Sequence, residues 1–74
     1  MKLIEIAQIY VDLVNLEKDV PDFEFHAKDE INALRSKYHN LLMQKMREEN
    51  VEFSDRFDAM NKVFELVKKE RLSA

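Results

Sequence analysis

The chain has 74 residues and a formal net charge of −3, with no glycine, no cysteine and one proline. This length allows a single domain, the missing cysteine excludes disulfides, and the missing glycine removes the usual residue of tight hairpin turns and phosphate-binding loops. Since helix-forming residues dominate the composition, we predict one all-α domain over residues 1–74. We expect an up-down-up three-helix bundle with a long second helix. We also expect it to form a homodimer, or a higher oligomer, through the first helix and one side of the second, since small folds often gain stability by self-association.

The first predicted helix, residues 3–18, is apolar over most of its circumference. Its polar side chains share a stripe about 80° wide at 100° per residue, and its apolar side chains cover about 240°. An ordinary surface helix buries a stripe of only about 100° or a little more. This helix must therefore contact neighbours on two or three sides. Either it is the central element of the bundle, or part of its surface belongs to another polypeptide.

The segment around Pro21 ends the first helix, because the residue before a proline is disfavoured in the helical conformation. Asp19 or Asp22 is expected to cap the helix that follows. The start of this second helix is open between Asp22 and His26, because the phenylalanines in this stretch suit either a first turn or a packed loop.

The second helix has a one-sided apolar stripe about 100° wide, typical of a surface helix. It is expected to end near Glu49, with Asn50 in the left-handed conformation that commonly follows a helix. At up to about 24 residues, or some 36 Å, it is longer than the first helix can cover. Part of its surface is therefore left for a partner.

Ser54 is expected to be the N-cap of a third helix that ends at Arg71. Apolar residues recur in it at spacings of three and four, so we predict that Phe57 and Phe64 face the core. The expected core of the whole domain includes Ile6, Tyr10, Leu13, Ile31, Leu34, Tyr38, Leu41, Phe57, Met60, Phe64 and Val67.

Candidate catalytic and metal-ligating residues are sparse. His26 and Glu30 lie one helical turn apart, which suits two metal ligands, but no third ligand has a compatible spacing. His39 lies at the edge of the apolar stripe without a catalytic partner, and the serines lack a nucleophile motif. We therefore expect no enzyme activity, no cofactor and no metal site.

The alternative to a protein-binding function is nucleic-acid binding. Basic residues gather toward the ends of the second and third helices, where they could contact phosphates. The candidate contacts are Lys45, Arg47, Lys68, Lys69 and Arg71. Cations are, however, expected at helix C-termini in any case, and the chain as a whole is acidic. We regard nucleic acid as the less favoured partner.

Apolar side chains left over after the bundle is packed indicate an interface, because aromatic residues and methionine are enriched at such surfaces. The candidates are Ile4, Ile9, Val11, Leu16, Phe23, Phe25, Met43 and Met46. We expect a non-enzymatic protein-interaction module, a small regulator or inhibitor that docks a helical face on a larger protein, on a second copy of itself, or on both. The sequence also shows no apolar run long enough for a membrane span and no signal-peptide pattern, so we expect a soluble cytoplasmic protein.

Overall fold

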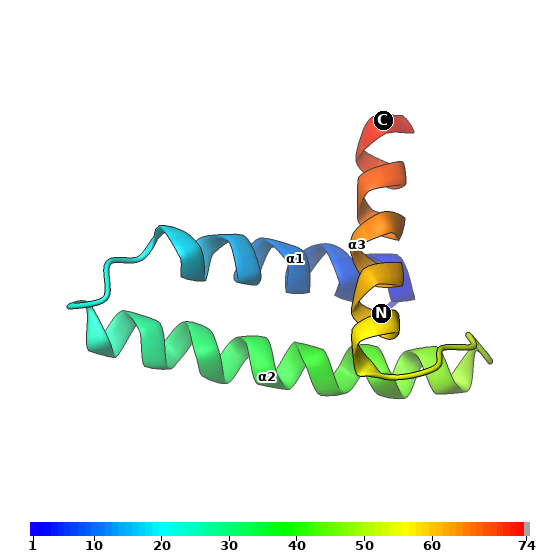
Figure 1. The fold of residues 1–74 in the computed structure, drawn as a ribbon, viewed down its shortest axis with the longest axis horizontal. Helices are drawn as coiled ribbons and strands as arrows, with labels where there is room; N and C mark the ends of the chain where they lie inside the picture. Colours follow the sequence, from blue (N-terminus) through cyan, green and yellow to red (C-terminus); the bar gives the residue numbers. More distant parts are fainter. Residues whose placement is uncertain (74) are drawn as a thin grey trace.

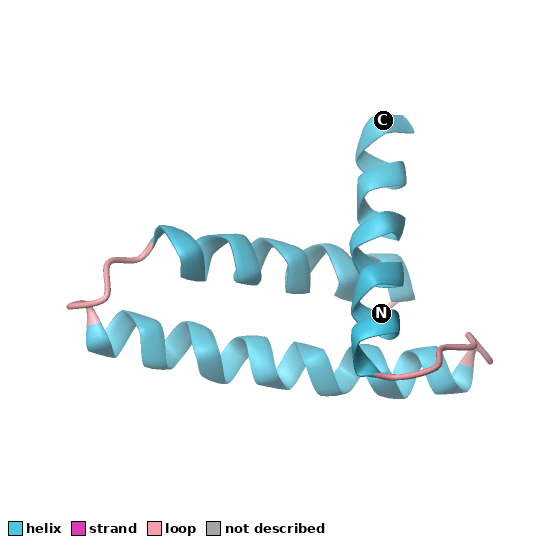
Figure 2. Cartoon of the chain, viewed as in Figure 1, coloured by secondary structure: helices cyan, strands magenta, loops and turns pink. Residues whose placement is uncertain are grey.

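The computed structural model describes residues 1–73 and contains three helices: α1 (Leu3–Asp19), α2 (Phe25–Glu48) and α3 (Arg56–Ser73). Helices α1 and α2 form an antiparallel hairpin, and short loops join the three elements (Figures 1 and 2). Helix α1 packs against both α2 and α3, whereas α2 and α3 scarcely contact each other. The all-α prediction is confirmed, and α1 is the central element of the bundle.

The direction of α3 differs from the expected up-down-up arrangement. Instead of lying alongside the hairpin, α3 crosses it, and its C-terminal end points away from α2 (Figure 1). The buried side of α3 consists of small residues, Ala59, Val63 and Val67, and α1 buries Ala7 and Val11. Small side chains on both helices allow a close crossing, which a layer of phenylalanines between the helix axes would prevent.

The α1–α2 turn is built differently from the predicted cap. Helix α2 begins at Phe25, and its N-cap Glu24 makes no side-chain cap hydrogen bond. Neither Asp19 nor Asp22 caps this helix, so that prediction is wrong. The Glu24 N–H donates to the Pro21 carbonyl at 3.0 Å, and Asp22 accepts from Lys28 Nζ at 2.9 Å. The backbone turn and this exposed ion pair shape the connection.

The C-terminal end of α2 confirms the prediction for Asn50, whose φ is 58°. The Asn50 N–H donates to the Arg47 carbonyl at 3.1 Å, and the Val51 N–H donates to the Met46 carbonyl at 2.9 Å. This pair of hydrogen bonds is a Schellman motif, which satisfies the last carbonyls of the helix. The chain is thereby turned toward α3.

Helix α3 begins at Arg56, and its cap is Asp55 rather than Ser54, one residue later than predicted. The Asp58 N–H donates to Asp55 Oδ1 at 2.8 Å, and the Ser54 N–H donates to Asp58 Oδ2 at 2.9 Å. The two carboxylates thus accept N–H groups that have no partner within the helix. The hydrogen bond from the Ser54 N–H lowers the pKa of Asp58, and the hydrogen bond and charge of Lys62 lower it further.

The core lies where α1 meets α2 and α3, and it differs in part from the predicted set. Of the predicted residues, Ile6, Tyr10, Ile31 and Val67 are buried. The partly buried ones are Leu13, Tyr38, Leu41 and Met60. The prediction is wrong for Leu34, Phe57 and Phe64, which are exposed. The two phenylalanines are exposed because α3 turns a different face inward, and Leu34 lies on α2, which α3 scarcely contacts. The buried residues that the prediction omitted are Ala7, Val11, Leu42, Met46, Ala59 and Val63.

None of the helices described over residues 1–73 is both long enough and apolar enough to cross a membrane.

Candidate binding cleft

An open cleft of about 540 Å³ lies in the corner where α3 crosses the α1–α2 hairpin. All three helices contribute to its surface. Its lining residues are Tyr10, Arg35, Ser36, His39, Asn40, Arg56, Phe57 and Met60.

Helical spacing explains why these side chains meet. On α2, Arg35 and His39 are one turn apart, so both project from the side that faces α3. Tyr10 of α1 forms the floor, with its ring centroid 6.0 Å from that of His39 and 6.5 Å from that of Phe64. Separations of this size are typical of packed aromatic pairs. Phe57 at the start of α3 forms the opposite wall and is 75% exposed. The cleft therefore combines an aromatic surface with a polar rim.

The rim is positively charged. None of the lining residues is acidic. Arg56 forms no ion pair with any residue between 1 and 73, so its guanidinium is free to bind a partner. Arg35 donates from Nη2 to Asn32 Oδ1 at 2.7 Å, and its Nε lies 2.7 Å from Glu17 Oε2. That Nε–H does not point at the carboxylate oxygen, so the second contact is an ion pair without a hydrogen bond.

The positive charge of the rim also affects the pKa of His39. Partial burial lowers the pKa of the His39 imidazole below its ordinary value, and the charges of Arg56 and Arg35 lower it further. Both effects disfavour the protonated ring. At neutral pH the cleft therefore presents the unpaired Arg56, an Arg35 whose charge is partly balanced by Glu17, and a neutral imidazole. This surface is suited to a carboxylate flanked by apolar groups.

The residues considered for metal binding do not form a site. His26 and Glu30 are both exposed near the start of α2. Within the part of the chain that the structure describes, no cluster of three or more acidic or histidine side chains could hold a metal ion.

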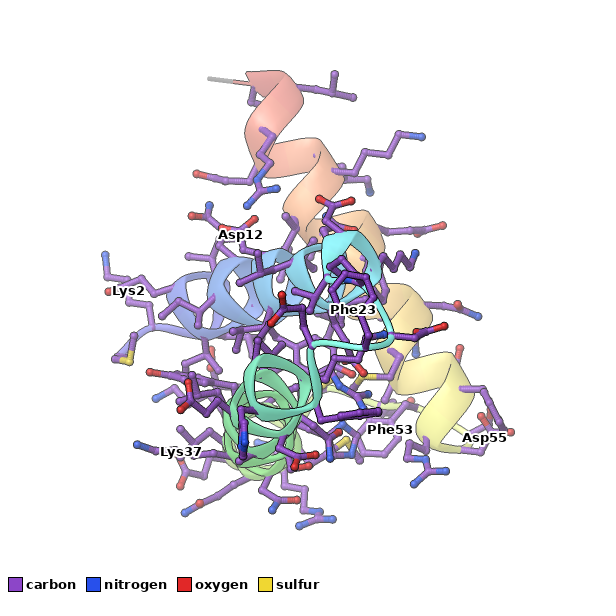
Figure 3. The ribbon with its side chains drawn as sticks, turned by 90° about the vertical axis from the view of Figure 1, so that its left-hand side faces the viewer. Lys2, Asp12, Phe23, Lys37, Phe53 and Asp55 are labelled. Carbon is purple, nitrogen blue, oxygen red and sulfur yellow. The ribbon has the colours of Figure 1, made fainter. Side chains whose placement is uncertain are left out.

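The predicted interface residues fall into two groups. Val11 and Met46 are buried in the core, and Ile4 and Met43 are partly buried against it, so these four side chains serve mainly the internal packing. Ile9 is partly buried. By contrast, Leu16, Phe23 and Phe25 are exposed, the two phenylalanines at 73% and 71%. Figure 3 looks onto the α1–α2 turn and shows Phe23 at this end of the molecule.

The basic residues proposed for nucleic-acid contacts are not brought together. Lys45 and Arg47 lie at the end of α2, whereas Lys68 and Lys69 lie on the part of α3 that points away from it (Figure 1). Arg71 is engaged within the chain, since its Nη2 donates to Asp12 Oδ1 at 2.7 Å. The five cations therefore do not form one continuous phosphate-binding surface.

The cleft itself was not among the predicted sites. A signal for one wall exists in the sequence, because Arg35 and His39 flank one side of the apolar stripe of α2. No such signal exists for Arg56, whose position depends on the crossing direction of α3. The periodic apolar pattern assigned Phe57 to the core, although its ring lies on the wall of the cleft.

Comparison with known proteins finds no matching protein family, no matching curated relative and no matching solved structure.

Proposed function

We propose that the chain is a non-enzymatic protein-interaction module and that the cleft is its docking surface. It would act as a small regulator or inhibitor by binding another polypeptide. The observation that carries this proposal is the placement of the phenylalanines. None of the five belongs to the buried core, and Phe23, Phe25 and Phe57 are each more than 70% exposed.

This placement is unusual for a domain of this size. A phenylalanine can bury about 150–250 Å² and is among the strongest contributors to a core. A short chain has little apolar surface to spare, so side chains of this size left in water favour a binding role over a purely structural one. Aromatic residues and arginine are also the types that dominate the energetics of protein interfaces. Arg56 and Phe57 are adjacent residues of these two types, and both line the cleft.

Nucleic-acid binding has less support. The basic helix ends are separated, Arg71 is paired with Asp12, and the chain carries a net charge of −3. A nucleic-acid-binding domain usually presents its cations as one patch or stripe, which attracts phosphates over a distance.

The test uses two exposed apolar positions on the same helix. Phe57 is 75% exposed and Leu72 is 76% exposed, so Phe57→Ser and Leu72→Ser remove comparable apolar surface with little effect on the core. The tagged chain is used to capture its partner from source cells, and the purified partner is then titrated. We expect Phe57→Ser to weaken binding about 30-fold, a typical effect at an interface hot spot, and Leu72→Ser to leave it unchanged. Circular dichroism confirms that both variants fold.

Two results would refute the proposal. One is equal loss of binding in both variants, because the cleft would then have no special role. The other is salt-sensitive micromolar binding to mixed DNA and RNA that Lys68→Glu and Lys69→Glu weaken, since phosphate contacts would explain that pattern.

A further inference from the structure

The α1–α2 turn of this chain combines acidic side chains, which are absent from the cleft lining, with exposed aromatic rings. Residues 22–25 read Asp-Phe-Glu-Phe, an alternation of acidic and aromatic side chains. Both phenylalanines are more than 70% exposed. Glu24 makes no ion pair within residues 1–73, and the exposed Asp22 is paired only with Lys28. The turn therefore presents two aromatic rings and a free carboxylate to its surroundings.

The cleft presents the complementary set. Arg56 is unpaired, Arg35 and His39 lie opposite it, and no acidic residue lines the surface. Tyr10 and Phe57 supply aromatic faces on which further rings could pack. Opposite charges and exposed apolar groups on both sides are what a specific interface requires, because the charges select the partner and the apolar contacts supply affinity.

The turn cannot reach the cleft of its own chain. Phe25 begins α2, and His39 follows fourteen residues later on the same helix, about 21 Å away at 1.5 Å per residue. The occupant must therefore come from another molecule. The turn of a second copy matches the cleft in both charge and apolar character, and both of its phenylalanines are exposed.

The spacing of residues along α2 allows each copy to place its turn at the cleft of the other. Phe25, Asn32 and His39 recur at intervals of seven, so they share one face of the helix. An antiparallel pair of α2 helices with its two-fold axis beside Asn32 places Phe25 of each copy opposite His39 of the other. The same register places Asp29 opposite Arg35. Both turns are thereby engaged at once, as a closed symmetric dimer requires.

We infer that two copies of the chain associate in this way, each placing its Asp22–Phe25 turn in the cleft of the other. The inference rests on the proposed function of the cleft as a protein-binding surface. When no external protein is present, the turn of the second copy occupies the cleft, and an external partner competes with it.

Charge exchange in the full-length chain tests the inference. Light scattering of the wild-type protein at about 50 µM should give twice the 8.9 kDa mass of one chain. Arg56→Glu and Glu24→Arg should each weaken dimerisation at least about tenfold, and the double variant should recover much of that loss. Lys37→Glu is the matched control, because Lys37 lies on the side of α2 away from α3 (Figure 3). It should leave dimerisation unchanged.

A disulfide trap checks the register without relying on charge. The chain has no cysteine, so every disulfide reports an introduced pair. Mixing Phe25→Cys with His39→Cys under mild oxidation should yield a cross-linked heterodimer, because the two positions face each other across the interface. Phe25→Cys mixed with Lys37→Cys should not. Equal cross-linking in the two mixtures would overturn the register.

Other results of these experiments separate the dimer inference from the proposed function. A wild-type monomer, or a dimer that neither charge reversal weakens, overturns the inference. If Phe57→Ser still abolishes binding of an external protein in that case, the proposed function stands without self-association. If no protein binds the cleft and no dimer forms, both proposals fail.

Discussion

Replacement of Leu42 by alanine tests the core directly, with Leu34 in the same helix as its control. Leu42 is fully buried, and the substitution removes three carbons, worth about 2.4 kcal/mol at roughly 0.8 kcal/mol per buried methylene. The cavity left behind raises the expected loss to about 3–4 kcal/mol. Leu34 is 45% exposed, so the same substitution there should cost about 1 kcal/mol, because solvent fills the space. Helix propensity changes equally in both variants.

The measurement is urea unfolding followed by circular dichroism at one fixed protein concentration, since self-association would make stability depend on concentration. A domain of this length is typically stable by roughly 4–11 kcal/mol, so Leu42→Ala should remove a large share and leave the slope of the transition unchanged. A loss at Leu34 equal to that at Leu42 would refute the reasoning. It would mean that Leu34 faces the core, as the sequence pattern predicted.

Two further predictions concern the end of α2 and the cleft. Asn50→Ala should destabilise the chain by about 1 kcal/mol, because a φ of 58° is unfavourable for a residue with a Cβ atom. Asn50→Gly should leave the stability unchanged or raise it slightly, since glycine has no Cβ. Thermal melts that give the alanine variant a higher melting temperature than the glycine variant would contradict this. The pKa of His39 is lower in the folded chain, so the unfolded chain binds a proton more readily than the folded one. The contribution of the neutral His39 ring to stability is therefore complete above the unfolded pKa near 6.5. It is lost as the pH falls from there through the lower pKa of the folded chain. Unfolding of dilute wild-type protein between pH 7.5 and 5 should therefore show a loss that His39→Gln reduces, and identical pH profiles would contradict the assignment.

The helices could be predicted because their signals are local. Pro21 ends the first helix, and Asn50 supplies the left-handed residue after the second, so neither depends on distant contacts. The large apolar arc of α1 also correctly indicated that this helix contacts more than one neighbour. These features depend on backbone preferences and on the spacing of side chains along a single helix.

The core face of α3 could not be predicted in the same way. Both the phenylalanine side and the side with Ala59, Val63 and Val67 are apolar enough to be buried, and a periodic pattern ranks the larger side chains first. The structure selects the smaller ones, because a close crossing of α1 gains more from small side chains than from bulky ones between the axes. The cleft depends on that choice, so it could not be inferred before the crossing direction was known.

The packing of α3 on α1, the helix farthest from it in sequence, affects how the chain assembles. The hairpin closes over the five residues 20–24, whereas α3 must return to a helix that begins some fifty residues earlier. Loop-closure entropy favours the local pairing, so the hairpin is the less demanding unit to form first. During synthesis, α1 emerges before α3, so the side of α1 that α3 covers stays exposed until α3 has left the ribosome. The strongly apolar surface of α1 is therefore exposed longest in the nascent chain, which makes this stage the most prone to aggregation.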